Sequence, residues 1–258
     1  MKKQTIKYLL LMMIALLSGA GHAASSVLVW PIFQVIEADQ QGSALWLENR
    51  GSRPVRLQIR VLAWQQVAYR DRYADQNNVI ASPPFASVPP QQRQLIRLIR
   101  TGAPPSQGEQ AYRIILDEIP DANVPAEKNS AGLRLQMRYV LPLFLDAPGV
   151  WTQTRNDLHR AAASASQPQL HWQQVTQQGK PMLQIRNQGV VHARLTNVFW
   201  GMQPVASKAS LTLTKGFLGY ILPGQTMQFP MPPGRAIPAG ATLYAQLSDN
   251  GSPVALAQ

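Results

Sequence analysis

Cysteine is absent from the 258 residues of the chain. No disulfide can therefore cross-link the fold, and its stability has to come from buried apolar side chains and hydrogen bonds. Histidine is scarce, with four in the chain, and there are 13 acidic residues against 24 lysines and arginines. Because cysteine and paired histidines are both missing, the sequence offers no dedicated zinc or copper site. We expect no metal and no cofactor.

The motifs of common enzymes are also missing. No histidine lies near a G-x-S-x-G elbow, and no glycine-rich phosphate-binding loop occurs. Glu37 and Asp39 form one carboxylate pair, but a pair of this kind is more often solvated than catalytic. We therefore expect a protein that is not an enzyme.

Residues 1–23 have the pattern of a secretory signal peptide. Three lysines precede an apolar run from Tyr8 to Leu17, and small residues lead to Ala23. The run is shorter than the ~20 residues that span a bilayer, and no later stretch reaches that length. We expect an exported protein without a transmembrane helix.

Removal of the leader takes away three lysines and no acid, which lowers the formal charge from +11 to +8. Two observations argue against a nucleic-acid partner. The protein is expected to be exported, and its arginines are scattered along the chain instead of being gathered in one run.

Short β-type runs broken by glycine, proline and asparagine follow the leader. In the first half we expect strands at 27–36, 43–49, 55–64, 78–81, 93–99, 111–118 and 133–145. Seven short strands in about 120 residues are typical of an immunoglobulin-like sandwich. We therefore predict an N-terminal immunoglobulin-like domain at 24–145.

The alternating pattern stops between 146 and 167, which we interpret as an interdomain linker with one or two helical turns. Beyond it strands are expected at 169–175, 181–187, 190–200, 217–222, 225–231, 241–248 and 253–257. These predict a C-terminal β-sandwich domain at 168–258, so that the whole protein is all-β.

The last run of the first domain, LRLQMRYVLPLFL at 133–145, carries an apolar stripe. Alternate positions of an extended strand share one face. Pro142 lacks an N–H for the ladder, which favours a place near a sheet edge or a bend. A long apolar stripe on an edge is an aggregation hazard, so either the protein's own interior or another polypeptide should cover it. The stripe consists of Leu133, Leu135, Met137, Tyr139 and Leu141.

Two stretches before this run are more specific. SPPFASVPPQQRQLIRLIR at 82–100 and AYRIILDEIP at 111–120, followed by LRLQMRYVLPLFL, together resemble the periplasmic pilus chaperones of chaperone–usher pathways. In the second half, LQIRNQGVVHARLTNV and GYILPGQTMQFPMP are similar to the corresponding strands of that family. The opening VLVWPI and the run QMRYVLPLF look most like its archaic, spore-coat-like branch.

The resemblance implies two immunoglobulin-like β-sandwich domains in an L-shaped arrangement with a cleft between them. Such chaperones bind pilus subunits, which lack the last strand of their own sandwich, and insert a strand into the gap. The stripe Leu133, Leu135, Met137, Tyr139 and Leu141 would then be donated to a subunit in a 1:1 complex. The resemblance also implies a periplasmic location, delivery of the subunit to an outer-membrane usher, and an option of self-association when the protein is free.

Relatives anchor the C-terminal carboxylate of the subunit with basic side chains in the cleft, a task that suits the guanidinium fork of arginine. Here the first strand has no arginine, and Pro142 stands where many relatives carry a lysine. We expect Arg113 and Arg138 to take this role, the alternative being a solvated or internally paired arginine. Arg97 is the second choice for the anchor, and we expect it rather to brace the interior or the domain interface through Glu118.

Two other functions remain open at this point. An exported pilus structural subunit or adhesin would also have immunoglobulin-like sheets, although it would normally begin with a donor extension. An exported glycan-binding or hydrolytic β-sandwich is disfavoured, because no aromatic platform and no catalytic carboxylate pair stand out in the sequence.

Overall fold

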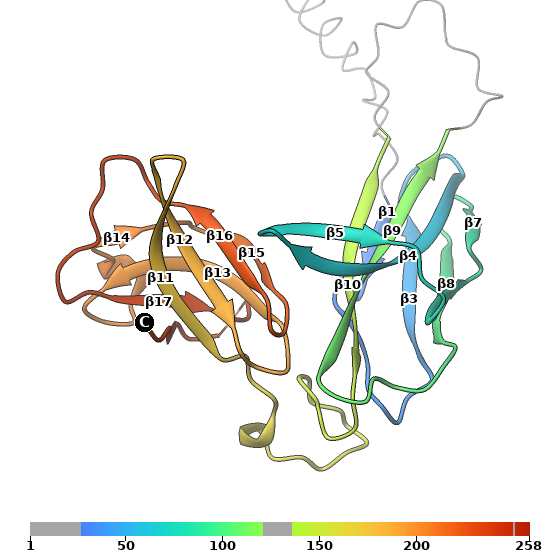
Figure 1. The fold of residues 1–258 in the computed structure, drawn as a ribbon. Coiled ribbons are helices and arrows are strands. Elements are labelled where there is room, and N and C mark those ends of the chain that lie inside the picture. The colour runs from blue at the N-terminus through green and yellow to red at the C-terminus, as the bar shows by residue number, and fades with distance from the viewer. Residues whose placement is uncertain (1–26, 121–135, 250) are drawn as a thin grey trace, which may run out of the picture.

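The computed structural model describes residues 27–120, 136–249 and 251–258. Nearly all regular structure in this part of the chain is β strand; the helices are two three-residue 3-10 turns, η1 (Ala162–Ser164) and η2 (Ala206–Lys208). Two sandwiches stand at an angle to one another and are joined at one end by a linker (Figure 1). No helix in the described ranges has the length and apolar character that crossing a membrane requires.

The first sandwich consists of two sheets. One has the order β1-β3-β8-β6, and the other has the order β2-β10-β9-β4-β5, with β7 paired to β4. The strands are β1 (Val27–Trp30), β2 (Gln34–Ile36), β3 (Gly42–Asn49), β4 (Val55–Val67), β5 (Arg70–Ala74), β6 (Val79–Ser82), β7 (Phe85–Val88), β8 (Arg93–Arg100), β9 (Glu109–Ile119) and β10 (Arg138–Asp146).

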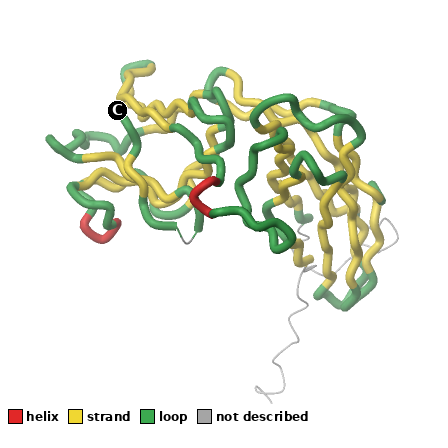
Figure 2. Tube along the Cα trace, turned by 90° about the horizontal axis from the view of Figure 1, so that it is seen from below, coloured by secondary structure: helices red, strands yellow, loops and turns green. Residues whose placement is uncertain are grey.

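The second sandwich pairs a sheet of order β11-β12-β16 with a sheet of order β14-β13-β17-β18, in which β15 also pairs with β13. Its strands are β11 (Leu170–Gln177), β12 (Lys180–Asn187), β13 (Ala193–Gly201), β14 (Leu211–Thr212), β15 (Phe217–Ile221), β16 (Thr226–Pro230), β17 (Thr242–Gln246) and β18 (Val254–Ala255). The predicted all-β fold of two sandwiches is confirmed. Figure 2 shows the linker and its turn η1 between the two sandwiches.

Three features of the first sandwich differ from the sequence prediction. The run 27–36 is two strands, because the chain passes from one sheet to the other after Trp30, at a cis bond to Pro31. Strand β5 was not predicted, since all five of its residues are exposed and it has no apolar alternation. Strand β7 was missed because it follows directly on two prolines, which usually mark a loop.

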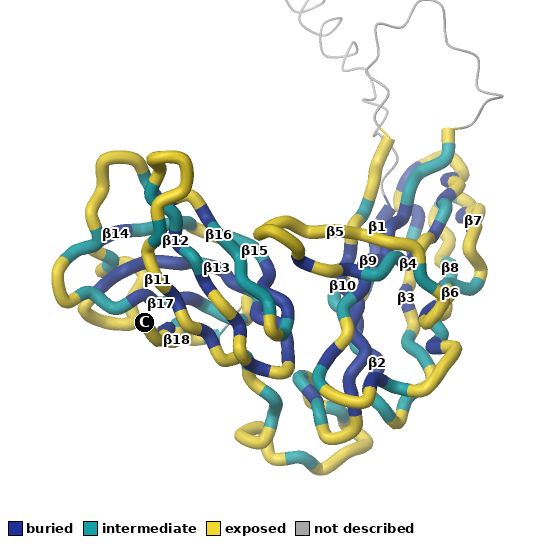
Figure 3. The backbone as a smooth tube through the Cα atoms, in the orientation of Figure 1, coloured by how far each residue is buried: buried dark blue, intermediate teal, exposed yellow. Residues whose placement is uncertain are grey.

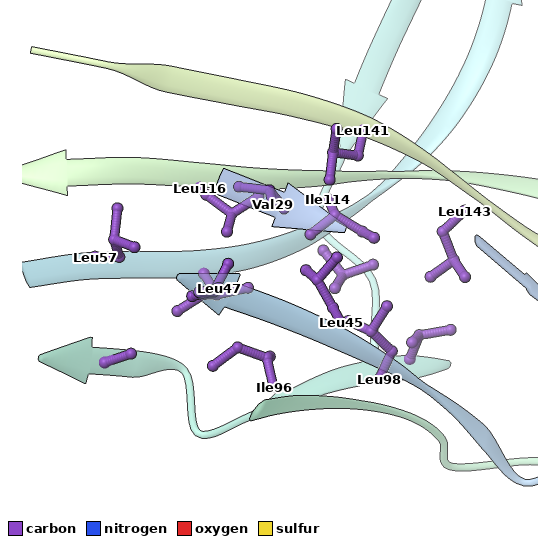
Figure 4. Packing of buried hydrophobic residues seen from close by; sticks show 14 of the residues in the cluster. Val29, Leu45, Leu47, Leu57, Ile96, Leu98, Ile114, Leu116, Leu141 and Leu143 are labelled. Carbon is purple, nitrogen blue, oxygen red and sulfur yellow. The ribbon is translucent and has the colours of Figure 1, made fainter. Parts of the chain in front are cut away.

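The core of the first sandwich forms because each strand turns alternate residues inward. Leu45 and Leu47 of β3 are fully buried and lie in one cluster with Leu57, Ile114 and Leu116 of the opposite sheet (Figure 4). Burying one such side chain is worth roughly 1.5–3 kcal/mol. Strand β10 contributes Leu141, Leu143 and Leu145 to the same cluster.

The two faces of β10 can be compared directly by substitution. We predict that Leu143→Ala lowers the free energy of unfolding by about 2–5 kcal/mol, because it leaves a cavity in a core where Leu143 is 0% exposed. Val140→Ala on the same strand removes an exposed side chain and should stay within about 0.5 kcal/mol of the wild type. Urea unfolding of the two variants measures both values, and equal losses would contradict this account of the core.

Candidate functional site

Half of strand β10 has no neighbour on one side. It pairs with β9 along its whole length, whereas β2 covers its other side only at Leu143–Leu145. Among the described residues no strand pairs with the remaining edge, Arg138–Pro142, which we call the open edge. It offers an incoming chain a row of backbone groups.

The direction of these backbone groups follows from one hydrogen bond. The Met137 carbonyl accepts from the Glu118 N–H at 3.1 Å. Because residues of an antiparallel strand point alternately to either side, the N–H and C=O groups of Arg138 and Val140 point toward the open edge. Pro142 takes the next position on that edge, where its missing N–H breaks no bond to β9.

The structure divides the apolar stripe. Leu133 and Leu135 lie outside the described residues, and Met137 is 42% exposed. Tyr139 is half-buried against the first core, and its hydroxyl donates to the Val27 carbonyl at 2.8 Å. Leu141 is buried in that core. In the free chain, the described part of the stripe therefore presents only Met137 to a partner, while Tyr139 and Leu141 pack against the protein's own interior.

The junction between the sandwiches is closed by aromatic side chains. Trp64 and Phe144 of the first sandwich form a buried cluster with Tyr220 and Leu222 of the second. The Phe144 ring stacks on the His192 ring at a centroid distance of 3.8 Å. The His192 Nδ1 lies 2.7 Å from a Glu109 carboxylate oxygen, which ties β9 to the second sandwich.

Strand β4 reaches past its own sandwich to hold this junction. The Gln66 side-chain amide donates to the Tyr220 carbonyl at 2.9 Å, and its oxygen accepts from the Leu222 N–H at 3.0 Å. Gln66 thus makes the two hydrogen bonds that a neighbouring strand would make. Beyond it, the exposed β4–β5 hairpin extends toward the second sandwich (Figure 3). Sequence analysis missed Gln66, Tyr220 and His192. For Gln66 the available signal was the long polar run that follows Trp64 in the sequence.

Arg113 lies in this junction, as the sequence predicted for a residue bordering the cleft. Its guanidinium carbon is 3.6 Å from the centroid of the Trp64 ring and 5.1 Å from that of the Tyr220 ring. The residue is 8% exposed, and its Nε has no hydrogen-bond partner among the described residues. Arg113 is therefore held in a fixed position by the two rings, with its Nε buried.

Arg138 is placed differently. Its side chain is 63% exposed and forms an ion pair with Asp117, which also binds Arg60 at 2.8 Å. The hydrogen bond from Arg138 and the second arginine lower the pKa of the Asp117 carboxyl. Arg138 thus corresponds to the alternative of an internally paired surface arginine.

The expected link between Arg97 and Glu118 is wrong. Arg97 is exposed on β8, between two buried neighbours, and so points away from the sandwich interior. Glu118 lies on β9 in the opposite sheet, where it accepts a hydrogen bond from the Met137 N–H at 3.3 Å. Glu118 has the same place in the alternation of β9 as the core residues Ile114 and Leu116, so Arg97 points away from it on the outer face of the other sheet.

The linker is held by the carboxylate pair that the sequence singled out. Arg155 binds Asp39 at 2.7 Å and Glu37 at 3.3 Å, and Arg160 binds Glu37 at 2.9 Å. Glu37 is buried, so these contacts fix the linker to the first sandwich. The pair therefore has a structural role.

A further carboxyl group, Asp146, is fully buried where β10 meets the linker. Neither of its oxygens has a hydrogen-bond partner among the described residues. Burial, with the charges of Glu109 and Glu37, raises the pKa of Asp146 to about 8, and Arg160 opposes the rise. In the described ranges, no three histidine or carboxylate side chains are grouped so that they could hold a metal ion.

Comparison with known proteins agrees with this geometry. Residues 33–150 match the family described as pili and flagellar-assembly chaperone, PapD N-terminal domain. A chain in the crystal structure of the CsuC–CsuE chaperone–tip adhesion subunit pre-assembly complex, from archaic chaperone–usher Csu pili of Acinetobacter baumannii, is 28% identical. That match covers 90% of this chain and 98% of the other, with a TM-score of 0.70.

Two further structures show the same fold. The E. coli chaperone DraB is 20% identical, with 92% of this chain and 100% of that chain covered and a TM-score of 0.56. A chain of the Salmonella enterica SafA pilin–SafB chaperone complex is also 20% identical, with coverages of 90% and 94% and a TM-score of 0.59. No curated protein matches the chain significantly. Residues 33–150 thus match the pilus-assembly chaperone family, and the chain as a whole is similar to a chaperone of an archaic chaperone–usher pathway.

The buried Asp146 leads to a prediction about pH. A carboxyl group with a pKa of about 8 in the folded chain and an ordinary value of 3.8 takes up a proton on folding between these values. The stability should therefore fall as the pH rises from about 4 to about 8. Asp146→Asn should flatten this decline and raise the stability near pH 7, whereas Asp75→Asn at an exposed site should not. Urea midpoints between pH 4 and pH 8 measure the effect, and an unchanged decline in Asp146→Asn would contradict it.

Proposed function

We propose that this protein is a periplasmic chaperone that stabilises pilus subunits by adding strand β10 to their incomplete sandwich. The observation that carries the proposal is the open edge Arg138–Pro142, which lies next to the exposed Met137. Each ladder hydrogen bond to a partner strand is worth about 0.5–1.5 kcal/mol net. Apolar side chains that enter pockets of the subunit would add to this.

Met137 is the described residue best placed for donation. Val140, 43% exposed on the other face of β10, adds apolar area beside the same edge. Leu133 and Leu135 continue the stripe of Met137 in the sequence and belong to the proposed donor segment. Tyr139 and Leu141 would support the strand from the inside, unless they turn outward when a subunit binds.

Arg113 is the proposed anchor for the C-terminal carboxylate of the subunit. It lies on β9 directly opposite Pro142, so it is next to the end of the open edge. The low exposure of Arg113 strengthens an ionic contact with a carboxylate. Arg138 fits this role less well, because Asp117 already neutralises it.

The remaining parts of the proposal rest on the family and on the sequence. We propose that residues 1–23 direct export to the periplasm, and that the subunit passes from the chaperone to an outer-membrane usher. We also propose the domain limits 24–145 and 168–258, with a linker at 146–167.

Donation by the stripe can be tested with a charge. Met137→Asp should reduce the recovery of subunit with the tagged chaperone from the periplasm at least tenfold, because a charge would be buried in an apolar pocket. Ile80→Asp is the matched control: it changes another exposed apolar residue, on β6, away from the open edge. Mass spectrometry and gel filtration of the expected 1:1 complex give the readout. Equal recovery with both variants would exclude donation through Met137.

The anchor can be tested separately. Arg113→Gln removes the charge and keeps part of the polar side chain, and we expect a similar loss of subunit complexes while the chaperone still exports and folds. Arg138→Gln should retain most of the recovery, since Arg138 is engaged with Asp117. If Arg138→Gln loses the complex and Arg113→Gln keeps it, the assignment of the anchor is reversed.

A further inference from the structure

We propose that a cavity between the two sandwiches, on the β4 side of β9, binds a small neutral saccharide. The cavity has a volume of about 590 Å³. Its wall comes from the end of β4, the start of β9, the loop before β6 and the turn between β15 and β16. Small-molecule sites have volumes in this range and often lie at domain interfaces. The inference does not depend on the proposed function.

The cavity is separate from the surface proposed for the subunit. In the sheet order β2-β10-β9-β4-β5, the open edge lies on the β10 side of β9, whereas β9 and β4 form the wall of the cavity. Neither Met137 nor Arg113, the residues proposed to bind the subunit, is among the described residues that line it. A ligand in the cavity and a pilus subunit would therefore use different residues.

The charges of the wall favour an uncharged ligand. Glu109 is the one charged side chain among the described residues that line the cavity. Both of its carboxylate oxygens are occupied, because one accepts from the His192 backbone N–H at 3.2 Å and the other lies 2.7 Å from the His192 Nδ1. A charged ligand would lose its hydration here and gain no free partner of opposite charge.

Amide side chains give the wall both donors and acceptors. The Tyr112 hydroxyl donates to the Gln110 oxygen at 3.0 Å and accepts from the Asn78 amide nitrogen at 3.2 Å. The other half of each amide, the NH₂ of Gln110 and the oxygen of Asn78, is left for a ligand. The side chains of Gln65 and Gln225 also line the cavity and make no hydrogen bond in the described part of the chain. Amides of this kind suit hydroxyl groups, which likewise donate and accept.

A buried donor in the wall supports the same conclusion. Trp64 lines the cavity and is 2% exposed, and its indole Nε1 has no hydrogen-bond partner among the described residues. A buried N–H without an acceptor is unfavourable, and such groups are rare in folded proteins. The oxygen of a ligand hydroxyl in the cavity could accept this hydrogen bond.

The wall also has an apolar part. Ala111 and Leu222 line the cavity and belong to the aromatic cluster of the domain junction. A sugar matches this mixed wall, because its ring carries several hydroxyls and also has C–H surfaces, whereas a peptide offers one donor and one acceptor per residue. Leu222 and Gln225 come from the second sandwich and the other residues from the first, so a bound sugar would contact both and stabilise their relative position.

Isothermal titration calorimetry with the full-length mature protein tests the site. The probes are three neutral disaccharides, maltose, cellobiose and N,N′-diacetylchitobiose. We expect at least one of them to bind with a dissociation constant of about 1 mM or lower. Two charged counterparts are the comparison: maltobionate, an anion, and chitobiose, which carries ammonium groups. Each should bind about tenfold more weakly than the neutral disaccharide, because its charge finds no free partner in the cavity.

Variants locate the ligand. Gln110→Ala and Gln225→Ala each remove one amide and should weaken binding about three- to tenfold. Trp64→Phe keeps an aromatic ring and removes the N–H donor, so it should weaken binding by a similar factor. Gln177→Ala is the matched control, since it removes an exposed glutamine on β11 and should leave the affinity unchanged. Met137→Asp at the open edge should also leave it unchanged. Circular dichroism checks that each variant is folded.

Three results would each refute the saccharide site. In the first, none of the neutral disaccharides reaches the expected affinity. In the second, a charged counterpart binds as tightly as the neutral one. In the third, the variants of Gln110, Gln225 and Trp64 keep the wild-type affinity, or Gln177→Ala loses as much as they do. These measurements need no pilus subunit, so their outcome is independent of the tests of strand donation and of the anchor.

Discussion

The uneven pairing of strand β10 is the constraint on which the rest of this molecule depends. At Leu143–Leu145 the strand has neighbours on both sides and is part of a closed core, whereas at Arg138–Pro142 one side is open. An unpaired edge is usually a liability that proteins cover or shorten. A chaperone for incomplete sandwiches requires such an edge, because the edge supplies the partner with its missing ladder. The closed half keeps the strand in register while the open half is available.

The domain junction determines what lies at the end of that edge. Gln66 bonds the backbone of β15, and Glu109 binds His192, so the two sandwiches have a defined relative position. This position brings Tyr220 against Arg113. A small rotation between the sandwiches would move Tyr220 away from Arg113, the proposed anchor. Rigidity at this junction is therefore part of the binding site, since preorganised groups lose less freedom on binding.

The same junction contains an unfavourable group. Asp146 is fully buried without a hydrogen-bond partner in the described part of the chain, close to Glu109. A buried carboxyl group avoids the cost of desolvation by keeping its proton. Its presence next to the linker makes the stability of the junction dependent on pH, while the ion pairs of Glu37 with Arg155 and Arg160 hold the linker from the other side.

By itself the sequence determined the fold class and most strands, because alternation and proline-led turns are local signals. The choice of Arg113 as a candidate anchor came from the resemblance to pilus chaperones. The tertiary structure decided which stripe residues are available: Met137 is exposed and Leu141 is buried, although both have the same place in the alternation. It also decided that Arg138 is paired with Asp117 and that Gln66 donates a hydrogen bond to the Tyr220 carbonyl. These contacts join residues that are distant in the sequence, and periodicity carries no information about which strand lies across a sheet or a cleft.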